Sequence, residues 1–153
     1  PKYVCPTDLH REHDLRQSEL RRQREKEERE KRRKKAMEDE KRFHELKSKF
    51  FGISFTDGTI QVHVLESEQE HLDEGVAMHH CVFDNAYYLK ENSLILSATI
   101  EGRRIETIEV NLNTLKVVQS RGVCNQNTEY HDQIVNLVNA NKRLIRQRMR
   151  QTA

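Results

Sequence analysis

The sequence predicts an α+β domain joined to a long charged helix, and three features of the chain support that class. From Thr7 to about Lys49 neither Gly nor Pro occurs and charged residues dominate, which favours one uninterrupted helix. Between residues 51 and 121, apolar residues alternate in short runs separated by turn signals, which is typical of an antiparallel sheet of about five strands. After residue 128, an apolar stripe with helical spacing predicts a C-terminal amphipathic helix.

The N-terminal segment is expected to be a solvated helix with Thr7 or Asp8 as its N-cap. Residues 21–35 contain no apolar side chain, so this part of the helix has no face to bury in a core. Its support is local, because Glu residues precede Lys or Arg by four positions, and each such pair stabilises a helix by about 0.2–0.5 kcal/mol. The expected division of the chain is a helical extension or linker, residues 1–49, and an α+β domain, residues 50–153.

The sheet is expected to start with a hairpin formed by residues 51–55 and 60–64 around the turn signal Asp57-Gly58. Alternation in a later strand places Glu109 on the face opposite to its apolar neighbours. Three further strands are expected to follow the hairpin, near residues 93–101, 104–112 and 115–121.

A short helix is expected between the hairpin and the later strands. Ser67 and Glu70 have the spacing of a capping box, which predicts the start of this helix, and Gly75 is expected to end it. The helix leads directly into a pair of histidines and a cysteine. A final helix is expected to begin near Thr128.

The adjacent residues His79, His80 and Cys81 allow three interpretations. They could be zinc ligands together with Cys124, although neighbouring side chains rarely all point at one ion, and the sequence therefore assigns no metal. Cys81 could be a nucleophile with a neighbouring histidine as its base. In the structural alternative, Cys81 packs in the core and the histidines are ordinary polar groups at a helix end.

A second group of polar residues belongs to the last two strands and the loop after them. Glu109 and Arg121 lie on consecutive strands, where a cross-strand ion pair is one expectation. A pocket that binds phosphate or transfers protons is the other. The members of this group are Arg104, Glu106, Thr107, Glu109, Gln119, Arg121, Gly122 and Asn125.

Charge is unevenly distributed, although the net charge of the chain is only +2. Residues 8–49 carry a net charge of +4, residues 50–127 carry −6 and residues 128–153 carry +3. An acidic middle between two basic arms is a signal of binding to a partner and says little about the fold. Because acids are mixed with bases in the first arm, the second arm is the cleaner candidate for phosphate contacts. Its arginines are Arg143, Arg146, Arg148 and Arg150.

Other features bear on the cellular setting. No stretch approaches the ~20 apolar residues that span a bilayer, so no membrane association is expected. The three cysteines are odd in number and far apart, which favours reduced thiols and a cytoplasmic location. The chain starts without Met, which suggests a fragment of a longer protein.

Three separated segments carry a family resemblance. They are Glu74-Gly75 with Met78-His79-His80-Cys81-Val82, then Thr107-Ile108-Glu109-Val110, then Val118-Gln119-Ser120-Arg121-Gly122-Val123-Cys124-Asn125. In residue pattern and in order they resemble the motifs of the PcfJ-like family, which occurs on conjugative plasmids and other mobile elements. The resemblance implies a conjugation-associated accessory role, with relaxosome or other element-encoded proteins as partners.

These observations predict a nucleic-acid-associated accessory domain that binds DNA or RNA. One alternative is a nuclease or other phosphodiester hydrolase that uses a His/Glu/Arg pocket, and another is a protein–protein scaffold. No cofactor is assigned from the sequence. The candidate catalytic residues are His79, His80, Cys81 and Glu109. The candidate ligand- or anion-binding residues are Tyr88, Arg104, Gln119, Arg121 and Asn125.

Overall fold

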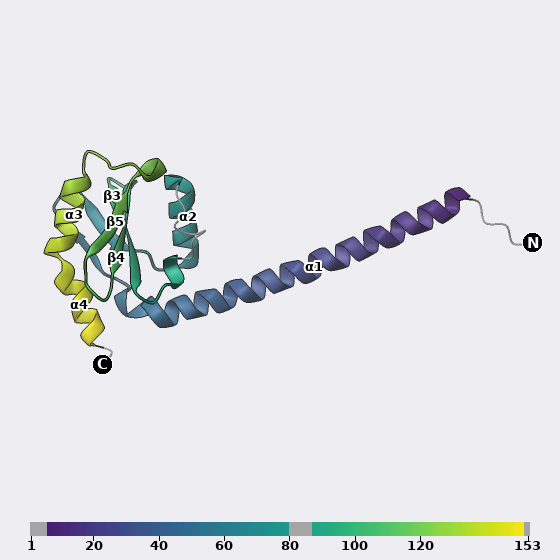
Figure 1. Ribbon diagram of the computed structural model, residues 1–153, viewed down its shortest axis with the longest axis horizontal. Coiled ribbons are helices and arrows are strands. Elements are labelled where there is room, and N and C mark those ends of the chain that lie inside the picture. Colours follow the sequence, from purple (N-terminus) through teal and green to yellow (C-terminus); the bar gives the residue numbers. More distant parts are fainter. Residues whose placement is uncertain (1–5, 80–86, 152–153) are drawn as a thin grey trace, which may run out of the picture. The chain divides into compact units, whose positions relative to one another are not determined.

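The computed structural model describes residues 6–79 and 87–151, and the chain divides into two compact units between Glu38 and Asp39 (Figure 1). The predicted α+β class is confirmed. The division lies ahead of the expected one between residues 49 and 50, because the last turns of the first helix, from Asp39 onward, pack in the second unit.

Helix α1 spans Pro6–Lys47, and every residue from 8 to 38 is exposed. An ion pair between Glu28 and Arg32, 3.5 Å apart, illustrates the local support expected for a solvated helix. None of the described helices is both long and apolar enough to cross a bilayer.

The second unit is built on one antiparallel sheet of five strands in the order β1-β2-β3-β4-β5, as predicted. Each strand pairs with the next one along the chain, so the sheet is a simple meander. The strands are β1 Ser54–Thr56, β2 Gln61–Val64, β3 Ser93–Ile100, β4 Arg103–Asn111 and β5 Val117–Arg121.

The first hairpin turns where the sequence predicts. Two backbone N–H groups of the turn donate to the Asp57 carboxylate at 2.9 and 2.7 Å, and Gly58 adopts the positive φ that glycine tolerates. Strand β1 starts at Ser54 and not at Phe51, because Gly52 also has a positive φ, which interrupts the extended backbone.

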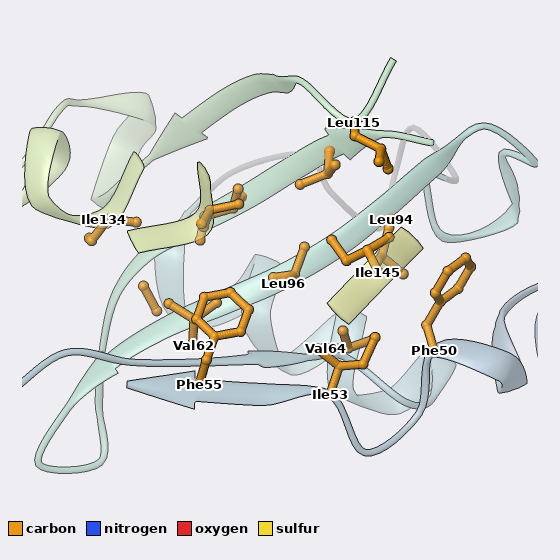
Figure 2. Close-up of a cluster of buried hydrophobic side chains, with 14 of the residues drawn as sticks. Phe50, Ile53, Phe55, Val62, Val64, Leu94, Leu96, Leu115, Ile134 and Ile145 are labelled. Atoms are coloured by element: carbon orange, nitrogen blue, oxygen red, sulfur yellow. The ribbon is translucent and has the colours of Figure 1, made fainter. Parts of the chain in front are cut away.

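One face of the sheet carries the hydrophobic core, covered by helices α3 (His131–Ala140) and α4 (Lys142–Arg150) (Figures 1 and 2). Alternate β3 residues such as Leu94 and Leu96 face these helices, and Ile145 of α4 is fully buried among them. Burying such side chains stabilises a fold by about 1.5–3 kcal/mol each.

The predicted C-terminal amphipathic helix is present, but the structure divides it into two helices, α3 and α4. Asn141 leaves the helical conformation (φ −116°, ψ 13°), and its side-chain amide donates to the carbonyl of Leu137 at 2.8 Å. Asparagine readily bonds to nearby backbone in this way, which favours a helix end. The break separates α4 from α3.

The other face of the sheet is covered by helix α2 (Glu68–Met78) and by the C-terminal turns of α1 (Figure 1). The Ser67 cap is confirmed, because its hydroxyl accepts from the Glu70 N–H at 3.0 Å.

The expectation that Gly75 ends α2 is wrong. The helix continues to Met78 and ends at His79, which has the left-handed conformation (φ 52°, ψ 48°) and donates its N–H to the Gly75 carbonyl. Gly75 instead belongs to the buried stripe of the helix, together with His71 and Glu74.

His71 joins α2 to α1 in a small aromatic cluster. Its ring lies 5.1 Å from that of Phe43 and 5.5 Å from that of Tyr88, measured between centroids. Its Nδ1 donates to the Ser67 carbonyl at 2.6 Å. Burial favours the neutral imidazole and lowers the pKa of His71 to about 4.

This depressed pKa predicts acid sensitivity. Between pH 6.5 and about 4 the unfolded chain binds a proton at His71 that the folded chain does not, so the free energy of unfolding falls as the pH drops through that window. We expect urea denaturation to show that protonation of His71 lowers the free energy of unfolding by a few kcal/mol across this window. His71→Phe, which keeps the ring, should flatten the pH dependence in this window. An equally steep dependence in the variant would contradict the assignment.

Candidate functional site

A row of polar side chains crosses the α2-facing side of the sheet. The strand register places His63 opposite Ser97, Ser97 opposite Thr107, and Thr107 opposite Arg121. Cross-strand partners on one face are close enough to interact directly. This face therefore offers hydroxyls, an imidazole and a guanidinium where the opposite face offers aliphatic groups.

Glu74 of α2 inserts its carboxylate into this polar row. The side chain is 1% exposed and accepts hydrogen bonds from Ser97 Oγ at 2.9 Å and Thr107 Oγ1 at 2.6 Å. Its second oxygen accepts from Arg104 Nε at 2.8 Å. A buried carboxylate needs such partners, and here they tie α2 to strands β3 and β4.

A pocket of about 470 Å³ opens beside this ion pair, between α2 and the strands of the first half of the sheet. Arg104 uses its Nε for Glu74 and is 41% exposed, which leaves its terminal nitrogens available to the pocket. The lining is mostly polar and suits a small hydrogen-bonding ligand. The lining residues are Ser54, Gln61, His63, Leu65, Glu70, Glu74, Ser97, Thr99, Gly102 and Arg104.

Glu109, a predicted catalytic residue, lies in a separate buried network. It accepts from Ser93 Oγ at 2.7 Å and from Gln119 Nε2 at 3.2 Å, and it is 7% exposed. Lys47 of α1 is buried beside it and donates to the carbonyls of Lys90 and Ser93. Burial lowers the pKa of Lys47 to about 8, and the negative charge of Glu109 partly opposes that shift. The network joins α1 to the start of β3.

Glu106 is the centre of a similar buried hydrogen-bond network on the core face of the sheet. It is fully buried and accepts from Ser120 Oγ at 2.6 Å, from Thr128 N–H at 2.8 Å and from His131 Nδ1 at 2.9 Å. Burial alone would raise the pKa of Glu106, but these hydrogen bonds outweigh it and lower the pKa below its usual value. Glu106 thereby fixes the start of α3.

The loop after β5 lies beside α2, so the structure brings two of the motif segments together. Gly122 has no room for a side chain, because a Cβ there would come within 2.6 Å of Thr128 Cγ2. Cys124 and Asn125 both have positive φ and are exposed. Arg121 donates to Asn127 Oδ1 at 2.7 Å, which holds the far end of the loop.

The predicted catalytic and ligand-binding residues are distributed over several places. The expected Glu109–Arg121 pairing does not occur, since the register puts Gln119 opposite Glu109. Tyr88 is buried in the aromatic cluster and donates to Glu68 Oε1 at 3.3 Å. His79 is an exposed helix cap.

His80 and Cys81 lie outside the described residues. Among residues 6–79 and 87–151, no three His, Cys, Asp or Glu side chains are grouped as a metal site would require. Of the residues predicted to bind a ligand, Arg104 is the one that lines the polar pocket.

Sequence reasoning missed Glu74 and His63 as members of the site. A signal for Glu74 existed, because positions 71, 74, 75 and 78 have the spacing of one buried helical face. His63 gave no such signal, since its place beside Ser97 depends on strand register.

Comparison with known proteins identifies a family. A family model described as PcfJ-like protein matches residues 1–135, most of the chain. No curated protein and no solved structure matches.

The Glu74 contacts predict a large loss of stability in Glu74→Gln. The amide keeps the size of the side chain but loses its charge and turns an N–H₂ group toward donors. We expect the free energy of unfolding, measured by urea denaturation, to fall by about 2–4 kcal/mol. The neighbouring Asp73→Asn, on the exposed side of α2, should change it by less than about 0.5 kcal/mol. Similar small losses in both variants would contradict the anchoring role.

Proposed function

Because this chain belongs to the PcfJ-like family, we propose that it is a nucleic-acid-associated accessory domain of a mobile genetic element. The family resemblance suggests the conjugation setting, with other element-encoded proteins as partners. The charge carried by α4 supports nucleic acid as the ligand.

The observation that carries the proposal is the composition of α4. The helix spans Lys142–Arg150 and contains five cationic residues and no acidic one. Arg143, Arg146 and Arg150 are exposed. Guanidinium groups pair with phosphate in a charge-assisted, often bidentate geometry, so this helix offers a surface suited to a phosphate backbone.

The opposite side of α4 fixes the helix to the domain. Ile145 is fully buried, and Leu144 and Met149 pack against the core. Arg148 Nη1 donates to the carbonyls of Lys49 at 3.2 Å and Phe51 at 2.9 Å. These bonds tie Arg148, also predicted to contact nucleic acid, to the rest of the domain, so the proposal rests on the three exposed arginines. These contacts hold α4 in place on the domain, while its exposed arginines face the solvent.

The predicted alternative of phosphodiester hydrolysis receives less support from the same structure. A carboxylate that acts as a general base must itself lie within reach of the proton that it abstracts. Glu74 and Glu109 are both buried, and their oxygens accept hydrogen bonds from the protein. Their geometry suits holding the fold together better than proton transfer.

We expect the triple variant Arg143→Gln, Arg146→Gln, Arg150→Gln to bind nucleic acid at least tenfold more weakly at 0.1 M salt. Each lost phosphate contact should also make the log–log salt dependence shallower by about one unit. Fluorescence anisotropy with a labelled duplex over a salt series measures both quantities. A denaturing gel of the same samples should show an intact strand.

The matched control replaces three exposed cations of the same unit: Lys41, Arg103 and Lys116. It removes the same charge and should weaken binding by threefold or less. Equal losses in the two variants would show that net charge, and not α4, governs binding. Shortened strands on the denaturing gel would favour the hydrolase instead.

A further inference from the structure

One strip along α1 carries bases without acids, although acids and bases are mixed in the sequence and on the rest of the helix surface. Four cations follow one another at positions i, i+4, i+7 and i+11 of this continuous helix, and they line one surface with Glu30 at its border. At 100° per residue they lie within about 60° of the helix circumference and extend over about 16 Å. We name this surface the basic ridge: Arg22, Lys26, Arg29 and Arg33.

The acidic residues of the same section lie away from the centre of the basic ridge. Glu25 and Glu30 flank it, about 70° from its centre, while Glu27 and Glu28 are on the opposite half of the helix. All of these residues are exposed, so the ridge is a solvent-facing line of positive charge.

Helix formation alone does not account for this arrangement. Like charges three or four positions apart repel one another and destabilise a helix, and the basic ridge contains three such neighbouring pairs. A sequence selected only for a stable charged helix would place Glu at some of these positions. The repulsion would be relieved if an extended anion ran along the ridge.

We propose that the basic ridge binds the phosphate backbone of duplex nucleic acid. The inference rests on the proposed association with nucleic acid, but it concerns a different surface from α4. A duplex fits better than a single strand, because residues 6–38 contain no Phe, Tyr or Trp on which unpaired bases would stack. The ridge also carries no apolar group of the kind that anchors a protein partner.

The test replaces all four ridge cations by Gln in the full chain and measures binding to a labelled 20-base-pair DNA duplex by fluorescence anisotropy. Loss of four phosphate contacts should weaken binding at least tenfold at 0.1 M salt and make the log–log salt dependence shallower by about three to four units. Parallel measurements with an RNA duplex and a single strand test the preference for a duplex.

A matched control is available on the opposite face of the same helix. The control replaces four exposed cations by Gln: Arg21, Arg24, Lys31 and Lys35. Like the ridge variant, it removes one pair in which Glu precedes Lys or Arg by four positions. Circular dichroism should show equal helix content in both variants. The control should bind within threefold of the unchanged chain.

The outcomes separate this inference from the proposed function. Loss of duplex binding in the ridge variant but not in the matched control supports the ridge. Equal loss in both variants overturns it, because binding would then follow net charge. If only the α4 variant loses binding, the proposed function stands and the ridge inference fails. If neither the unchanged chain nor any variant binds a duplex, both the proposed function and the ridge inference fail.

Discussion

The buried carboxylate of Glu74 is the interaction on which the arrangement of α2 depends. A negative charge that is 1% exposed is tolerated only when hydrogen bonds and a counter-charge replace water. Ser97, Thr107 and Arg104 supply them from two adjacent strands. This constraint fixes where α2 lies on the sheet, and with it the position of the polar pocket and of the loop after β5.

The two faces of the sheet hold their covering helices by different interactions. On the face covered by α3 and α4, aliphatic burial supplies the stability, and the buried carboxylate of Glu106 sets the start of α3. On the face covered by α2, hydrogen-bonded charges are the main contacts, with Glu109 and Lys47 forming a second network. Charged groups held in this way serve the fold, and we propose that exposed arginines bind the ligand.

Much of the fold was predictable because its signals are local. Alternating apolar residues and the Asp57-Gly58 turn identify the hairpin from a few neighbours in sequence. The site was less predictable, because the partners of Glu74 and Glu109 depend on strand register, which a sequence does not display. The break at Asn141 was missed for another reason, since apolar residues continue with helical spacing on both sides of it.

We propose that helix surfaces bind nucleic acid, while the polar face of the sheet holds the fold together. Titration of the isotopically labelled chain with a short DNA duplex, followed by two-dimensional NMR of the backbone amides, tests it most directly. We expect the largest changes in chemical shift in residues 22–33 and 143–150. Changes concentrated instead around His63, Glu74 and Arg104 would contradict it and make the pocket the nucleic-acid site.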